Sequence, residues 1–177
     1  MMQISEFDIE ALKQIRKNVD EFVSQMAVMY GKPNTHLLDI APQVHKGAAP
    51  FFTQSIIDTL DIDPNSGATF IADICKSNNV VPKNHYDYIV CTEVLEHTLQ
   101  PFDAVKQIYS FLKPGGLTFV STPFNFRIHG PLPDCWRFTE HGLRALFHDF
   151  EILSLQSVDT PDRFLMPIHY TLVARKP

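Results

Sequence analysis

After Pro33 the sequence alternates short apolar runs with helical or irregular stretches, and this alternation constrains the fold more than any other feature. The runs are rich in β-branched residues, as is typical of β-strands. They are 37–40, 56–62, 69–74, 88–92, 117–122, 150–155 and 170–174. Between the fourth and fifth runs, residues 102–112 place their apolar side chains on one helical face, and the Lys-Pro-Gly-Gly stretch 113–116 ends that helix. Alternating strands and helices predict an α/β protein whose open, mostly parallel sheet is covered on both faces.

Residues 5–30 have the pattern of one amphipathic helix. Its apolar positions are spaced alternately three and four residues apart. They are Leu12, Ile15, Val19, Phe22, Met26 and Met29. Ser5 and Asp8 resemble a capping box, and Gly31 followed by Pro33 ends the helix. We therefore expect residues 1–33 to form a covering helix on a domain spanning 34–177. The same stripe suits a coiled-coil seam, so a homodimer through this helix is the alternative.

Composition excludes several functions. The 177 residues suit one domain, and 15 basic against 20 acidic residues, with no basic run, argue against nucleic-acid binding. No apolar stretch reaches the roughly 18 residues of a membrane span. The N-terminus carries no signal-peptide pattern, and three cysteines at irregular spacings indicate neither a disulfide framework nor a zinc site. These features predict a cytoplasmic protein.

Carboxylates stand at the ends of four successive predicted strands. They are Asp39, Asp61 with Asp63, Asp73 and Glu93. Although a single such Asp is more often a cap or turn residue, the carboxyl ends of parallel strands meet at one edge of a sheet, where ligands bind. Carboxylates accept hydrogen bonds and attract cations, and the turn 39–45 lacks the glycines that bind a pyrophosphate. The pattern favours a ligand with hydroxyls, an amine and positive charge, such as adenosine joined to an amino acid through a sulfonium.

Two stretches resemble the class I S-adenosylmethionine-dependent methyltransferases. Residues 86–97 (YDYIVCTEVLEH) are followed by 112–116 (LKPGG), and 129–139 (HGPLPDCWRFT) resemble a small bacterial branch, the type 11-like methyltransferases. The resemblance covers about residues 36–175. It implies a Rossmann-like seven-stranded sheet with an antiparallel last strand, S-adenosylmethionine as cofactor, and methyl transfer to a small molecule or glycan.

The resemblance assigns cofactor-binding roles to particular residues. Asp61 matches the acid that binds the ribose diol, and Asp73 matches the position beside the adenine amino group. Thr92 and Glu93 match the strand end that faces the methionine part and the transferred methyl group. Asp39 matches the acid that orients the first turn and the ligand's ammonium group.

The first turn departs from the family pattern. Positions that carry glycine in the family are here Ala41, Gln43 and His45, and Gly47 supplies a permissive position only if the turn is longer. This departure favours an alternative function, in which a degenerate methyltransferase fold acts as a non-catalytic metabolite-binding or protein-interaction domain.

Residues 123–138 form a long segment without periodicity, which we expect to be a lid over the substrate. A hydroxyl or amine acceptor loses a proton on methylation, and the candidate bases are Glu93, His97, His129 and Asp134. We favour His129, which we also place at the substrate, and expect His97 to be a structural hydrogen-bonding group.

Trp136 and Arg137 have two interpretations. Either they line the acceptor pocket, or Trp136 anchors the segment and Arg137 pairs with a carboxylate. Residues 93–97 lack a second histidine at helical spacing, and Cys135 with His129 and Asp134 lacks a tetrahedral spacing pattern, so the sequence predicts no metal site.

Overall fold

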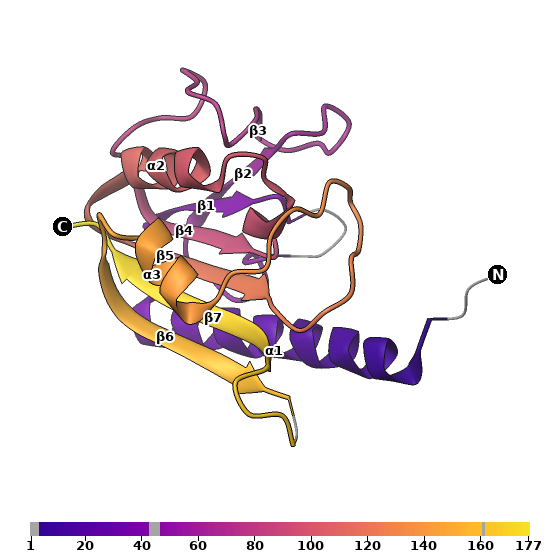
Figure 1. Ribbon diagram of the computed structural model, residues 1–177. Helices are drawn as coiled ribbons and strands as arrows, with labels where there is room; N and C mark the ends of the chain where they lie inside the picture. The colour runs from indigo at the N-terminus through magenta and orange to yellow at the C-terminus, as the bar shows by residue number, and fades with distance from the viewer. Residues whose placement is uncertain (1–3, 43–46, 161) are drawn as a thin grey trace.

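The strands form one sheet of the predicted kind. In the computed structural model, which describes residues 4–42, 47–160 and 162–177, seven strands lie in the order β3-β2-β1-β4-β5-β7-β6 (Figure 1). They are β1 (His36–Ile40), β2 (Ile56–Asp61), β3 (Phe70–Ile71), β4 (Tyr86–Thr92), β5 (Leu112–Pro123), β6 (Glu151–Asp159) and β7 (Pro167–Arg175). The pairs from β3 to β5 are parallel, and β7 is antiparallel to both β5 and β6. The predicted mostly parallel sheet with an antiparallel last strand is confirmed.

Helix α1 (Glu6–Tyr30) covers one face of this sheet (Figure 1). The Ser5 side chain accepts a hydrogen bond from the Asp8 backbone N–H, as the capping pattern predicts, and the helix ends before Gly31. Phe22 and Met26 pack with Leu37 of β1, whereas nearer the start of the helix Ile15 packs with Ile168. Because α1 extends past the carboxyl ends of β1 and β4, its first half is placed to form a wall of any site at that edge.

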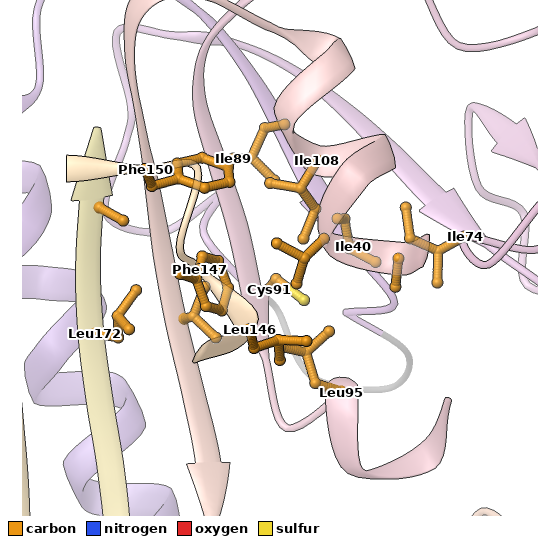
Figure 2. Packing of buried hydrophobic residues seen from close by; sticks show 14 of the residues in the cluster. Ile40, Ile74, Ile89, Cys91, Leu95, Ile108, Leu146, Phe147, Phe150 and Leu172 are labelled. Atoms are coloured by element: carbon orange, nitrogen blue, oxygen red, sulfur yellow. The ribbon is translucent and has the colours of Figure 1, made fainter. Parts of the chain in front are cut away.

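Helices α2 (Pro101–Phe111) and α3 (Glu140–Leu146) cover the opposite face. Figure 2 shows Ile108 of α2 beside Ile89 of β4, and Leu146 of α3 near Leu95, in this core. Leu95, from the short 3-10 helix η1 (Leu95–His97), is also fully buried there. The buried Leu95 fixes η1 beside the carboxyl end of β4, which determines where its neighbours Glu96 and His97 lie.

None of the helices in the described ranges has the length and apolarity needed to cross a membrane.

Candidate active site

The predicted series of acids lies at the carboxyl edge of the sheet. Asp61 is the last residue of β2, Glu93 directly follows β4, and Asp73 lies two residues beyond β3. Ile40 pairs with Leu60, and Asp39 pairs with Val90, so Ala41, Asp61 and Thr92 stand level at the strand ends. The structure thus brings these sequence-predicted residues to one edge.

The turn after β1 folds back onto the buried Asp39. Asp39 Oδ2 accepts a hydrogen bond of 2.7 Å from the Ala48 backbone N–H. Gly47 has a φ of 53°, and a Cβ added there would lie 2.0 Å from Asp39 Oδ2. Ala41 also has a positive φ, of 51°. Gly47 therefore supplies the permissive position of a longer turn, while Gln43 and His45 lie outside the described residues.

Burial raises the pKa of the Asp39 carboxyl group to about 6, although the Ala48 hydrogen bond opposes the shift. An acid whose pKa is higher in the folded protein than in the unfolded chain lowers stability as pH rises between the two values, from about 4 to about 6. Asp39→Asn keeps an acceptor for Ala48 and removes the titration. We expect the variant to gain about 3 kcal/mol of unfolding free energy over the natural protein at about pH 7.5 but little at about pH 4, as measured by urea unfolding. An equal difference at both pH values would contradict this account.

Asp61 and Asp73 differ in how many hydrogen bonds and ion pairs their carboxylates make with neighbouring residues of the chain. Asp61 Oδ1 accepts from the Asp63 backbone N–H at 2.9 Å. Asp73 accepts from the Cys75 N–H at 2.9 Å and also pairs with Lys76 at 3.1 Å. Burial favours a higher pKa for Asp73, but the Cys75 and Lys76 interactions outweigh it and hold the pKa below its usual value.

A cavity of about 490 Å³ opens at this edge of the sheet. Its walls come from the inner side of α1, the turn after β1, the residues that follow β4, and the segment after β5. Residues contributed by these four parts include Leu12, Ile15, Val19, Ala41, Pro42, Gly47, Thr92, Glu93, His97, Phe126 and His129. The cavity therefore joins a wall on α1, where apolar side chains alternate with Arg16 and Asp20, to a polar wall at the end of β4.

Glu93 is held in a strained conformation at the cavity wall. Its φ is 55°, a sparsely populated region for a residue with a side chain. Glu93 Oε1 accepts from Ser121 Oγ at 2.8 Å and lies 2.6 Å from His169 Nε2. Burial favours a higher pKa for Glu93, but His169 and Ser121 outweigh it and hold the pKa below its usual value. Glu93 is thus an ionised carboxylate at neutral pH.

His169 is a site residue that the sequence analysis missed. It is fully buried in β7, and its Nδ1 lies 2.5 Å from Asn18 Nδ2 of α1. Since an amide nitrogen is a donor, Nδ1 accepts and Nε2 carries the proton that bonds Glu93. The one signal in the sequence was a histidine inside an apolar strand, which is compatible with many other roles.

Asp134 and Arg137 hold the segment after β5 in place. Arg137 donates to both carboxylate oxygens of Asp134, at 2.5 and 2.8 Å, and to the carbonyls of Phe126 and Arg127. This arrangement lowers the pKa of Asp134 to about 2, chiefly through the Arg137 hydrogen bonds. The Trp136 indole donates to the Thr98 carbonyl at 2.7 Å.

His129 is the titratable residue of this segment among the described residues that line the cavity, beside Phe126, Gly130 and Pro131. Its backbone N–H donates to Asp134 Oδ2 at 2.9 Å, and its Nδ1 lies 3.1 Å from the same oxygen. Burial lowers the pKa of His129, although Asp134 acts in the opposite direction. Asp134, Trp136 and Arg137 are not among the described residues that line the cavity. They make the anchoring contacts, which was one of the two interpretations of Trp136 and Arg137.

Glu96 and His97 extend the polar wall. The Glu96 carboxyl group is fully buried, and both its oxygens lack a hydrogen-bond partner. Burial, reinforced by the charge of Glu93, raises the pKa of Glu96 well above its usual value. His97 Nδ1 lies 3.0 Å from the Pro133 carbonyl oxygen, a structural contact of the expected kind.

Comparison with known families gives one match that spans most of the chain. Residues 10–156 match the model of a methyltransferase domain family. Among curated proteins, a hybrid PKS-NRPS synthetase of Fusarium sp. (strain FN080326) is 34% identical over 82 residues, which are 43% of this chain. The match covers only 2% of the synthetase, so the chain corresponds to a small part of that protein.

Solved structures share the fold at low sequence identity. An S-adenosylmethionine-dependent methyltransferase from Mesorhizobium loti is 15% identical, with a TM-score of 0.68 over 90% of this chain and 99% of that one. A Burkholderia thailandensis 1,6-didemethyltoxoflavin-N1-methyltransferase, solved with its substrate and S-adenosylhomocysteine, is also 15% identical. Its TM-score is 0.63 over 99% of this chain and 92% of that one.

Proposed function

Since the chain belongs to the methyltransferase domain family, whose cofactor is S-adenosylmethionine, we propose that it transfers the methyl group to a hydroxyl or amine of a small-molecule or glycan acceptor bound against α1. The observation that carries the proposal is the continuous cavity. It runs from the backbone turn at Ala41 and Gly47, past Thr92 and Glu93, to the apolar side of α1.

The residues at the sheet edge fit this cofactor. Gly47 leaves no room for a side chain beside Asp39, so backbone rather than side chains lines the cavity there. Asp61 lies level with this turn but is not among the described residues that line the cavity; it uses Oδ1 for its own turn bond and is the acid we assign to the ribose diol. The ionised Glu93 at the cavity wall suits the ammonium and sulfonium charges of the methionine part.

The bound cofactor supplies an already activated methyl group, so the protein's task is to position the acceptor, exclude water and receive a proton. Leu12, Ile15 and Val19 supply the apolar part of the α1 wall, which helps to exclude water, and Arg16 and Asp20 of the same helix also line the cavity. His129 is neutral at pH 7 because burial lowers its pKa, and we assign it the acceptor's proton. Residues 123–138, which carry His129 to the cavity, are the proposed lid.

The acceptor class is argued from the shape and polarity of the cavity. An apolar wall with a few polar groups suits a small organic molecule or one sugar unit. The toxoflavin-type substrate of the Burkholderia relative is a molecule of this size class. The proposal includes a cytoplasmic location, and it leaves open a homodimer through α1, whose outer side exposes Val28 and Met29.

Calorimetry with S-adenosylmethionine and S-adenosylhomocysteine tests the proposal. We expect micromolar binding of both compounds, weakened roughly tenfold or more in Asp61→Asn, where each tenfold is about 1.4 kcal/mol. The amide still accepts the Asp63 N–H but no longer accepts from two ribose hydroxyls as a carboxylate does. The matched control is Asp149→Asn, an exposed acid after α3, which should leave affinity within twofold. If the natural protein bound neither compound, the non-catalytic alternative would replace the proposed function.

A further inference from the structure

Glu96, His97 and His129 form a cluster of metal-type donors beside the cavity. One donor atom from each residue lies within 4.8 Å of the other two. Glu96 Oε1 is 3.7 Å from His97 Nε2 and 3.8 Å from His129 Nε2. Glu96 and His97 are adjacent on η1, whereas His129 comes from the segment after β5, and both histidines line the cavity.

The Glu96 carboxyl group carries an unusual energetic cost. It is fully buried, yet neither oxygen has a hydrogen-bond partner. An unpartnered buried polar group costs about 1–3 kcal/mol, and more when it is charged. The nearby guanidinium of Arg137 does not remove this cost by hydrogen bonding, because its donors are used by Asp134 and by backbone carbonyls. A cation bound beside Glu96 would offset this cost.

Both histidines present Nε2 to this carboxyl group. A carbonyl oxygen only accepts hydrogen bonds, so the contact with Pro133 places the His97 proton on Nδ1. His129 Nδ1 lies 3.1 Å from the Asp134 carboxylate but makes no hydrogen bond to it. Both rings turn Nε2 toward Glu96. For His97 this is the orientation of histidines that ligate metals, whose second ring nitrogen is held by a carbonyl or a carboxylate.

We propose that Glu96, His97 and His129 bind a divalent first-row transition-metal ion, with Zn²⁺ as its representative. Donors at about 2.1 Å from a tetrahedral ion lie about 3.4 Å apart. Glu96 Oε1 lies 3.7 and 3.8 Å from the two Nε2 atoms, and the three donors span up to 4.8 Å, so the side chains must move closer together when the ion binds. Two imidazoles and one carboxylate suit Zn²⁺ better than Mg²⁺. A sequence pattern does not find this site, because His129 is far from Glu96 along the chain and joins it only through the fold.

The ion would also give the proposed methyl transfer a way to bind and activate the acceptor, and this part of the inference rests on the proposed function. Three protein ligands leave a coordination position open, and both histidines border the cavity, so an acceptor oxygen is placed to complete the coordination. Coordination lowers the pKa of a bound hydroxyl group. If the ion occupied His129 Nε2, that nitrogen would no longer receive the acceptor's proton, and Glu93, which also lines the cavity, would be the base in its place.

Metal titration of the chelator-treated full chain tests the site. We expect one equivalent of Co²⁺ to bind with the visible absorption of a low-coordinate ion, and one equivalent of Zn²⁺ to displace it, while excess Mg²⁺ does not. Glu96→Gln and His129→Gln should each weaken Zn²⁺ binding at least a hundredfold. His148→Gln, a surface histidine after α3, is the matched control and should bind as the natural protein does. Circular dichroism checks folding, and Glu96→Gln is expected to fold because it replaces a buried ionisable group with a neutral one of the same shape.

Two outcomes would overturn the metal site. One is the failure of the natural chain to take up an equivalent of Co²⁺ or Zn²⁺ at micromolar concentration. The other is unchanged uptake in folded Glu96→Gln and His129→Gln. A proton would then be what neutralises Glu96. S-adenosylhomocysteine calorimetry on the same preparation separates the two proposals, because retained cofactor binding without metal uptake contradicts the metal site alone.

Discussion

Gly47→Ala should destabilise the protein by about 2–5 kcal/mol and weaken S-adenosylhomocysteine binding at least tenfold. The new Cβ would lie 2.0 Å from Asp39 Oδ2 and 2.8 Å from Pro42 Cβ. Forcing an atom into such a space costs about 1–3 kcal/mol, and the positive φ adds about 1–2 kcal/mol for a residue with a side chain. The turn must move to relieve the contact, and the Ala48–Asp39 hydrogen bond moves with it. Urea unfolding and calorimetry measure the two effects.

Gly67→Ala provides the matched control. Gly67 has a φ of 74°, but a Cβ added there would meet nothing within 4 Å. This variant should therefore lose only the backbone cost of about 1–2 kcal/mol and keep its cofactor affinity. If the two variants lost equal stability and both bound the cofactor normally, the turn after β1 would not be part of the cofactor site.

The fold was predictable because the residues that form it are close in sequence and regular in pattern. The apolar run 88–92 and the helical pattern 102–112 correspond to β4 and α2. The predicted strand boundaries were less accurate for β6, at the edge of the sheet beyond β7. This strand continues to Asp159, well past the apolar run ending at 155. There the strand is extended by its backbone pairing with β7, which does not depend on which side chains are apolar.

The candidate site was predictable only where it follows from strand ends. Asp61 and Glu93 reach one edge because parallel strands end there, and a sequence pattern contains that information. The contact between Glu93 and His169 joins residues 76 positions apart. A histidine inside the apolar sequence of β7 does not indicate which residue its side chain contacts. Glu96 was missed for a related reason. A Glu beside a His on a short helix suggests a solvent-exposed pair, whereas here the Glu96 backbone carbonyl accepts from Cys135 and Trp136 N–H groups, and the segment after β5 lies against it.

Arg137→Met should decouple methyl transfer from cofactor binding. Removing the guanidinium leaves Asp134 fully buried without its cation and frees the Phe126 and Arg127 carbonyls. Breaking a buried pair from one side costs about 3–5 kcal/mol, which we reduce to about 2–4 kcal/mol because about a quarter of the Arg137 side chain is exposed. The loss should fall on residues 126–137, since η1, α2 and the sheet form their own core. We expect kcat/KM to fall at least tenfold, while the Kd for S-adenosylhomocysteine stays within threefold.

The pH dependence identifies the charge pair as the cause. The pKa of Asp134 is lowered to about 2, chiefly by Arg137. An acid whose pKa is lower in the folded protein adds stability that is present above its unfolded value and is lost as pH falls through the folded value. The natural protein should therefore lose its advantage over Arg137→Met as pH falls from about 4 to about 2. A stability difference that persisted unchanged at about pH 2 would point to lost side-chain packing instead.

Asp134→Asn combined with Arg137→Met separates two effects of the pair: its contribution to the stability of the protein, and its role in holding residues 126–137 against the cavity. The double variant buries no lone charge, so it should recover part of the stability that Arg137→Met loses, and the amide still accepts the His129 N–H. It does not restore the donors that bound the Phe126 and Arg127 carbonyls, so residues 126–137 should stay sensitive to limited proteolysis and turnover should stay low. We therefore expect stability to recover in the double variant while turnover stays low. Recovered stability with full turnover would show that the position of this segment does not matter for methyl transfer. The proposed lid would then be wrong.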